Sequence, residues 1–188
     1  MPKPAMHTRA PAARTVFRRA VQGSIAMLAA ASFQAAATDD PSVEIRLHGF
    51  NEVPAVSSAA QGRFKAWLDA GGIVRYELSY SGLEGEVRQA HIHLGQRGVN
   101  GGIMVWLCQT ATNADPLGRA PVCPQSGSVS GVLDATVIGA QAAGQGVAAG
   151  EFAEFVAAVR AGVAYVNVHS AKFPGGELRG QLQAGHHH

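Results

Sequence analysis

Short segments in which apolar and polar residues alternate are the feature that most constrains the fold of this chain. The alternation begins at residues 43–48 and continues through residues 62–68. The Gly71-Gly72 pair then marks a hairpin turn into a third alternating run at residues 73–80. Period-two alternation predicts strands with one face toward a core and the other toward water.

The same reasoning extends to the rest of the chain. Further strands are predicted at residues 89–94, 103–108, 164–169 and 177–183. Residues 151–160 instead place apolar side chains at helical spacing between two glycines, which predicts a short amphipathic helix. We expect this helix to cover the open end of a barrel, with partner binding as the less favoured alternative. The fold class is therefore all-β, a barrel or sandwich with one short helix.

Two of the alternating runs carry histidines. His91 and His93 are separated by Ile92, and His169 closes the later run after Val168. Side chains of successive strand residues point to opposite faces, so Ile92 and Val168 are expected in the core. The three imidazoles are then expected on the outer, polar face, where they would form a transition-metal site if the two strands lie side by side.

His48 also falls on the wet face of its predicted strand. It is therefore a candidate fourth ligand. The alternative, a solvated strand residue without a ligand role, is favoured because nothing else in the local sequence points to a metal.

The N-terminal residues 1–37 are typical of an export signal. Five basic residues precede an uncharged apolar run over residues 20–31, which is too short to span a bilayer. We expect cleavage before Thr38, which makes the mature protein periplasmic or secreted. The Arg18-Arg19 pair leaves twin-arginine export open, although the general secretory route is favoured.

The mature chain then divides into two parts. Residues 38–184 form the predicted single domain, and residues 185–188 form a flexible histidine tail that we exclude from any site.

Removing the signal changes the charge of the chain. It carries five of the fifteen basic residues and none of the thirteen acidic ones, so ten basic residues face thirteen acidic ones and the net charge becomes −3. A nucleic-acid partner is not expected at this charge. No later segment is long and apolar enough for a membrane helix, so no membrane insertion is expected after cleavage.

Cys108 and Cys123 are the two cysteines of the chain. In an exported protein a disulfide is the expected state, and a loop of this size gives about 3 kcal/mol in the loop-entropy model. A cysteine metal site is the less favoured alternative.

Five blocks in order resemble the CHRD, or chordin-type, domain. They are Leu47-x-Gly49-x-x-Glu52-Val53-Pro54, Tyr80-Ser81-Gly82-Leu83, Ala90-His91-Ile92-His93-x-Gly95-x-x-Gly98-x-Asn100-Gly101, Tyr165-Val166-Asn167-Val168-His169 and Gly175-Gly176-Glu177-Leu178-Arg179-Gly180-Gln181. Members of this family occur among exported bacterial proteins and in chordin. The resemblance implies a fold and a compartment more than a reaction.

A more distant resemblance is to copper/zinc superoxide dismutases. In that family a Greek-key β-barrel holds copper on its outer wall through a His-x-His strand and a later histidine, with a functional arginine beyond it. His91, His93, His169 and Arg179 occur in the same order. The resemblance implies one copper ion on these histidines. Zinc is not expected, because no counterpart of the histidine-rich zinc loop or of the bridging histidine is present.

The same resemblance suggests roles around the metal. Arg179 would guide a small anion or a dioxygen species to an open position of the copper, although a structural pair with Glu177 or another carboxylate explains it equally well. Glu52 and Asn167 would orient the ligand imidazoles by hydrogen bonds, with a cross-strand backbone contact as the plainer explanation for Asn167.

Three functions follow from these predictions. The favoured one is an exported, copper-binding β-barrel with a redox or copper-handling role. The alternatives are a metal-free, non-catalytic interaction module and a superoxide dismutase-like enzyme. The sequence identifies no protein partner.

Overall fold

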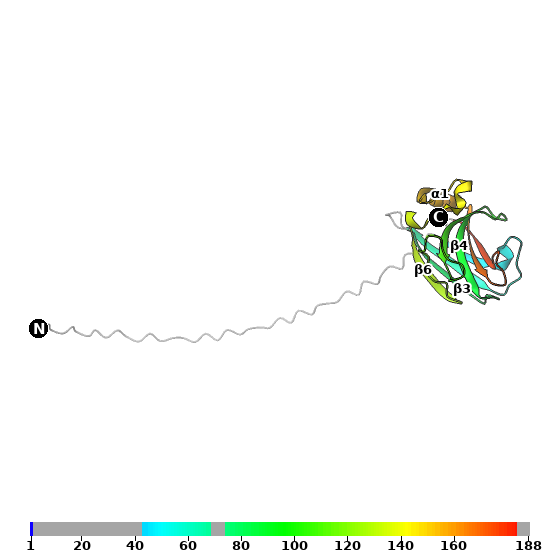
Figure 1. Ribbon diagram of the computed structural model, residues 1–188, viewed down its shortest axis with the longest axis horizontal. Helices are drawn as coiled ribbons and strands as arrows, with labels where there is room; N and C mark the ends of the chain where they lie inside the picture. Colours follow the sequence, from blue (N-terminus) through cyan, green and yellow to red (C-terminus); the bar gives the residue numbers. More distant parts are fainter. Residues whose placement is uncertain (2–42, 69–73, 184–188) are drawn as a thin grey trace, which may run out of the picture. The chain divides into compact units, whose positions relative to one another are not determined.

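The computed structural model of this protein describes Met1 and residues 43–68 and 74–183 (Figure 1). Three predicted features lie outside these residues. They are the signal peptide at residues 1–37, of which only Met1 is described, the Gly71-Gly72 turn and the histidine tail at residues 185–188.

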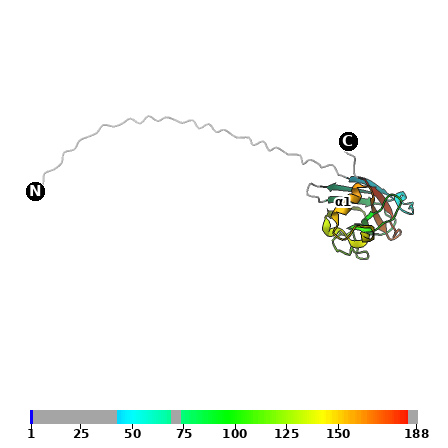
Figure 2. The ribbon, with the colours of Figure 1, turned by 90° about the horizontal axis from the view of Figure 1, so that it is seen from above.

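Eight antiparallel strands form one sheet in the described part of the chain. They are β1 (Val43–His48), β2 (Gln61–Leu68), β3 (Val74–Ser81), β4 (Val87–Leu94), β5 (Ile103–Cys108), β6 (Gly127–Leu133), β7 (Ala164–Ser170) and β8 (Leu178–Leu182). The strand order is β5-β4-β7-β8-β1-β2-β3-β6, and the sheet curls until β5 and β6 approach each other (Figure 2). β6 pairs with β3 and β7 returns to pair with β4, so that β4 and β5 lie between β7 and β6, which is a Greek-key arrangement. The all-β barrel prediction is confirmed.

The inner faces of the strands form one apolar core. Ile92 and Val168, predicted to face inward, are buried there together with Leu47 and Phe64. Burying one face of every strand fixes the register, because a shift of one residue would turn each of these side chains outward. The opposite faces of the strands are consequently also defined.

β6 is the one strand that the alternation did not predict. It pairs with β3 along its whole length, and the two strands lie side by side in Figure 1. Its sequence is rich in glycine and serine, and its Gly131 lies against the ring of Tyr76, whose atoms would contact any added side chain. Pairing with β3 therefore outweighs a weak local strand preference.

The short helices lie between β1 and β2 and between β6 and β7. They are η1 (Gly49–Asn51), η2 (Ala135–Val137), η3 (Ala140–Gln145) and α1 (Phe152–Arg160). The helix predicted at residues 151–160 is thus present as α1, which lies at one end of the barrel (Figures 1 and 2). Phe155 and Ala158 of α1 are buried in the core. Among the residues described, no helix is long and apolar enough to cross a membrane.

A disulfide and two tyrosines connect the two edges of the sheet. Cys108 at the end of β5 is bonded to Cys123, which precedes β6, so the predicted disulfide is present. Tyr76 Oη donates to the carbonyl oxygen of Leu107, and Tyr80 Oη donates to that of Pro124, both at 2.6 Å. These contacts hold the β5 edge against β3 and the segment before β6.

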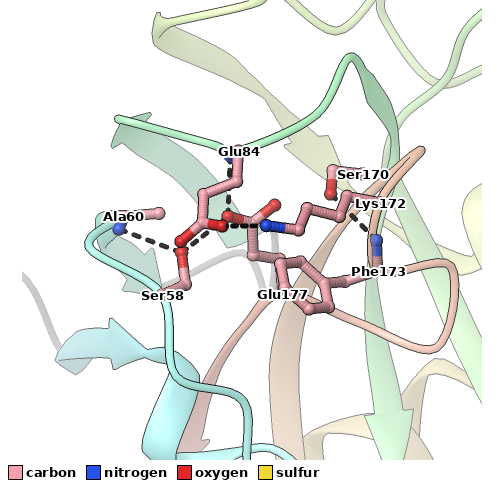
Figure 3. A network of polar contacts seen from close by, with 7 residues as sticks. All are labelled: Ser58, Ala60, Glu84, Ser170, Lys172, Phe173 and Glu177. Carbon is pink, nitrogen blue, oxygen red and sulfur yellow. Dashed lines mark hydrogen bonds and ion pairs between the residues drawn. The ribbon is translucent and has the colours of Figure 1, made fainter.

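A buried carboxylate joins three connections of the barrel (Figure 3). Glu177 is 0% exposed, and its Oε1 accepts hydrogen bonds from Ser58 Oγ at 2.7 Å and from the backbone N–H of Glu84 at 2.9 Å. The Glu84 carboxylate in turn pairs with Lys172 in the turn between β7 and β8. The connections η1–β2, β3–β4 and β7–β8 are therefore tied together.

Replacing Glu177 with Ala should destabilise the barrel. The change removes the acceptor from the half-buried Ser58 hydroxyl and from the Glu84 N–H, at a cost of about 2–4 kcal/mol in the free energy of unfolding. Glu177→Gln keeps an acceptor oxygen and should cost about 1 kcal/mol. Urea denaturation measures both values, and equal losses in the two variants would contradict this role of the carboxylate.

Candidate metal centre

One cross-strand row on the outer face of the barrel carries most of the site. His91 on β4 lies opposite Trp106 on β5 and opposite Asn167 on β7. Asn167 lies opposite Arg179 on β8. Residues directly opposite in neighbouring strands share a face, so these four side chains form a continuous row.

The three predicted histidines come together on this face. His91 and His93 share one face of β4, and His169 enters from β7 opposite Gln89. One ring nitrogen of each imidazole lies within 4.8 Å of those of the other two. The ring centroid of His91 is 5.4 Å from that of His93 and 5.0 Å from that of His169. The predicted convergence of the two runs is therefore present.

The three histidines are buried although they lie on the outer face of their strands. His91 is 0% exposed, His93 is 7% exposed and His169 is 6% exposed. They do lie on the face opposite the core, but the backbone carbonyl oxygens of Gly101 and Pro174, from the β4–β5 and β7–β8 connections, contact them from outside. Connections folded over a strand can bury its outer face, and alternation alone does not detect them.

Two backbone carbonyl oxygens set the protonation of two of the rings. His93 Nδ1 lies 2.9 Å from the carbonyl oxygen of Gly101, and His169 Nδ1 lies 2.9 Å from that of Pro174. A carbonyl oxygen only accepts hydrogen bonds, so both Nδ1 atoms carry the proton. In the neutral rings, both Nε2 atoms then present lone pairs to the interior of the cluster.

Asn167 lies between these two lone pairs. Its Oδ1 is 3.0 Å from His93 Nε2 and 3.0 Å from His169 Nε2, so acceptors face acceptors. Two arrangements resolve this. In one, a cation accepts the lone pairs. In the other, the amide is turned so that its NH₂ group donates to both nitrogens and its oxygen faces Glu52, which then has to be protonated to donate.

His91 is the ring whose hydrogen-bonding atoms are not all satisfied. Its Nδ1 lies 3.2 Å from His169 Nε2, whereas its Nε2 is buried without a hydrogen-bond partner. If Nδ1 binds a cation, the proton sits on Nε2. The Trp106 ring is next to this imidazole, with 4.3 Å between centroids in an edge-to-face arrangement. An N–H pointing at an aromatic ring is a weak but favourable contact.

Glu52 supplies the carboxylate nearest to this network. It contacts Asn167, and its Oε1 is buried without a hydrogen-bond partner. Burial raises the pKa of this carboxyl to about 7, against the lowering effect of the Arg179 charge. Gly176 is needed beside it, because a Cβ at that position would collide with Glu52 Oε1. Glu52 is therefore linked to the imidazoles through Asn167.

Arg179 occupies a setting different from that of a free anion guide. It is 2% exposed, and its guanidinium donates to Asn100 Oδ1 at 3.0 Å and to the carbonyl oxygens of Val99 at 2.7 Å and Gln96 at 3.4 Å. All three acceptors belong to the β4–β5 connection that also holds Gly101. The alternative pair with Glu177 does not form, because that carboxylate binds Ser58 and Glu84.

Tyr165 connects Arg179 to the cluster and was missed by the sequence reasoning. The Tyr165 ring stacks on His93 with 4.7 Å between centroids, and the guanidinium carbon of Arg179 lies 3.4 Å from the Tyr165 centroid. The available signal was that Tyr165 alternates with Asn167 and His169 on β7, which places the three side chains on one face. Trp106 was missed as well, and the continuous apolar run of β5 offered no such signal.

The structure does not bring His48 into the group. It is exposed on β1, beside Arg179 in register but outside the cluster. Within residues 43–68 and 74–183, the group of His91, His93 and His169 is the one that combines three or more potential metal ligands at bonding range.

The fold and the cluster together define an antiparallel β-barrel domain with a buried three-histidine site on its outer wall. The family model of the CHRD domain matches residues 43–182. The chain therefore belongs to the CHRD domain family, as its five sequence blocks predicted. Comparison with curated proteins and with solved structures gave no match. The likeness to copper/zinc superoxide dismutases stays a prediction.

Acid should destabilise the metal-free protein through the three buried imidazoles. Burial lowers the pKa of His91 to about 2 and that of His169 to about 4, and it also lowers the pKa of His93. Below about pH 6.5 the unfolded chain therefore binds more protons than the folded one, and stability falls as the pH falls. Each ring contributes at most about 1.4 kcal/mol per pH unit.

Glu52 should act in the opposite direction. Its raised pKa means that the folded chain binds the extra proton between about pH 4.5 and about pH 7, so its contribution to stability falls as the pH rises. Glu52→Gln should therefore steepen the loss of stability in acid. Urea denaturation of metal-free protein between pH 7 and about pH 4.5 checks both slopes. A free energy of unfolding that is constant over this range in both the wild type and Glu52→Gln would refute both.

Replacing Arg179 with Lys should loosen the β4–β5 connection. Lysine keeps the charge but not the planar fork that reaches Asn100 and two carbonyl oxygens. We expect a loss of about 2 kcal/mol or more in stability. Hydrogen exchange should be faster at residues 99–102, including the Gly101 N–H that donates to Tyr165 Oη. Unchanged protection of these amides would show that the guanidinium does not hold the connection.

Proposed function

We propose that this CHRD-domain protein is an exported copper-handling protein that holds one copper ion through His91, His93 and His169. The main support for this proposal is the direction in which the imidazole lone pairs point. Two imidazoles are fixed by carbonyl oxygens with Nε2 inward, and the third brings Nδ1 to within 3.2 Å of His169 Nε2. With its proton on Nε2, His91 adds a third neutral acceptor, and three acceptors at this range favour a cation between them.

The donor set favours copper among the transition metals. It consists of neutral imidazoles, with no thiolate in the group, because both cysteines are in the disulfide. Imidazole suits copper well, and Cu²⁺ exceeds the other divalent first-row ions in affinity for such sites. Three imidazoles hold Cu(I) in a trigonal arrangement and Cu(II) with a position left open. Zinc stays the less favoured ion, since it follows Cu²⁺ in this order.

The contacts around Arg179 favour copper handling over superoxide chemistry. An arginine that guides an anion has to present free N–H groups to solvent. Here the guanidinium donates hydrogen bonds to Asn100, Val99 and Gln96 and lies on the face of the Tyr165 ring. Its role is then to position the connection that fixes His93. Retention of the ion is supported by the burial of all three rings.

Metal analysis of the mature protein tests this proposal. The protein should lack residues 186–188, so that the terminal histidines bind nothing. We expect about one copper ion per chain, and Cu(II) electron paramagnetic resonance should show splitting from imidazole nitrogens. His169→Gln should lower copper affinity by about tenfold or more. Loss of a residue that only supports a ligand typically costs about 10–100-fold in metal affinity, and loss of a ligand should cost at least as much.

The matched control is His48→Ala, which removes an exposed histidine from the same face. It should leave copper content and the resonance spectrum unchanged. Because the triple replacement of His91, His93 and His169 removes buried side chains, its fold has to be checked by circular dichroism. Copper uptake that survives in a folded triple variant, or a copper affinity that is unchanged in His169→Gln, would reject the site. A folded wild-type protein that takes up no copper would favour the metal-free interaction module.

A further inference from the structure

A groove on the outer wall of the barrel lies apart from the histidine cluster. It is a hollow of about 540 Å³ across β1, β2, β3 and β6. One row of its lining runs through the register: Arg46 lies opposite Arg63, which lies opposite Ser79, which lies opposite Ser128. Small hydroxyl side chains on β3 and β6 leave the space that the two arginines border.

A second row lies two residues further along the strands. His48 lies opposite Gln61, which lies opposite Ser81. Both rows therefore end in basic side chains on β1 and in hydroxyl groups on β3 or β6. Phe50, two residues beyond His48, is 74% exposed and provides an aromatic surface next to the end of β1.

One of the two guanidinium charges in this groove has no ion-pair partner in the described part of the chain. Arg46 and Arg63 are directly opposite on neighbouring strands, an arrangement that is unfavourable for like charges. Arg63 pairs with Glu44, whereas Arg46 has no ion pair within the described ranges. The groove lining contains no carboxylate, although the chain beyond residue 37 carries more acidic than basic residues. An anionic ligand would relieve the repulsion.

The polar lining selects among anionic ligands. β1, β2 and β3 are each paired on both sides, so their backbones cannot accept an added peptide strand. Two arginines are few for a nucleic-acid backbone, and no aromatic ring in the lining is exposed for base stacking. Serine hydroxyls and the Gln61 amide are suited to sugar hydroxyls, and guanidinium groups are suited to carboxylates.

We propose that this groove binds a polysaccharide chain that bears carboxylate groups, of the uronic-acid type. Arg46 and Arg63 bind the carboxylates, and Ser79, Ser128 and Gln61 bind the sugar hydroxyls. The histidine cluster does not line the groove, so the two sites are independent.

Calorimetric titration with a polygalacturonate oligomer tests the proposal. The mature protein should bind it at low ionic strength, and a dextran oligomer of the same length should not bind. The double variant Arg46→Gln/Arg63→Gln should lose on the order of tenfold in affinity or more, because two charge-assisted contacts disappear. Backbone amide shifts on oligomer binding should map to the strand ends that line the groove, at residues 46–48, 61–63, 79–81 and 127–128.

The matched control is Arg75→Gln/Arg119→Gln, which removes the same charge from exposed positions outside the groove. It should bind the oligomer as the wild type does. An equal loss in this control would show charge attraction without a site and would overturn the proposal. Equal binding of dextran, equal binding of polyglutamate or no binding of polygalacturonate would overturn it as well. Circular dichroism serves as the check that each variant keeps the fold of the barrel.

Discussion

The hydrogen bonds from two backbone carbonyl oxygens to imidazole Nδ1 atoms are the interactions on which the histidine cluster depends. Gly101 and Pro174 provide them from connections on either side of the site. Each carbonyl fixes the orientation of one ring and the location of its proton. Everything that holds those connections in place, from Arg179 to the buried Glu177, therefore acts on the direction of the lone pairs at His93 and His169.

Burial restricts the protonation states that these three rings can adopt. A charged imidazole is strongly disfavoured at His91, where desolvation is the largest cause of the lowered pKa. The rings are therefore neutral acceptors, with too few protons to satisfy each other. The same network has a metal-free solution, in which Asn167 donates and Glu52 is protonated. A cation and a turned amide thus compete for the same lone pairs, and the raised pKa of Glu52 keeps both arrangements within reach near neutral pH.

The strands and the histidine cluster could be predicted from the sequence because alternation fixes which side chains share a face. Ile92 and Val168 point inward, and the histidines point outward as expected. Alternation carries no information on what covers an outer face, so the burial of His91 was missed. β6 was missed for a related reason: its Gly and Ser residues have weak strand preference, and pairing with β3 decides its conformation.

The covering connections also explain why neighbours in one row differ in chemistry. His48 and Arg179 lie opposite each other on β1 and β8. Arg179 lies beneath the β4–β5 connection and donates hydrogen bonds to it. His48, in contrast, is exposed at the border of the basic groove. The strand register brings both residues to one wall, and the connection divides that wall into a dry part and a wet part. A buried three-histidine cluster and an open basic groove can therefore share a single sheet without sharing a side chain.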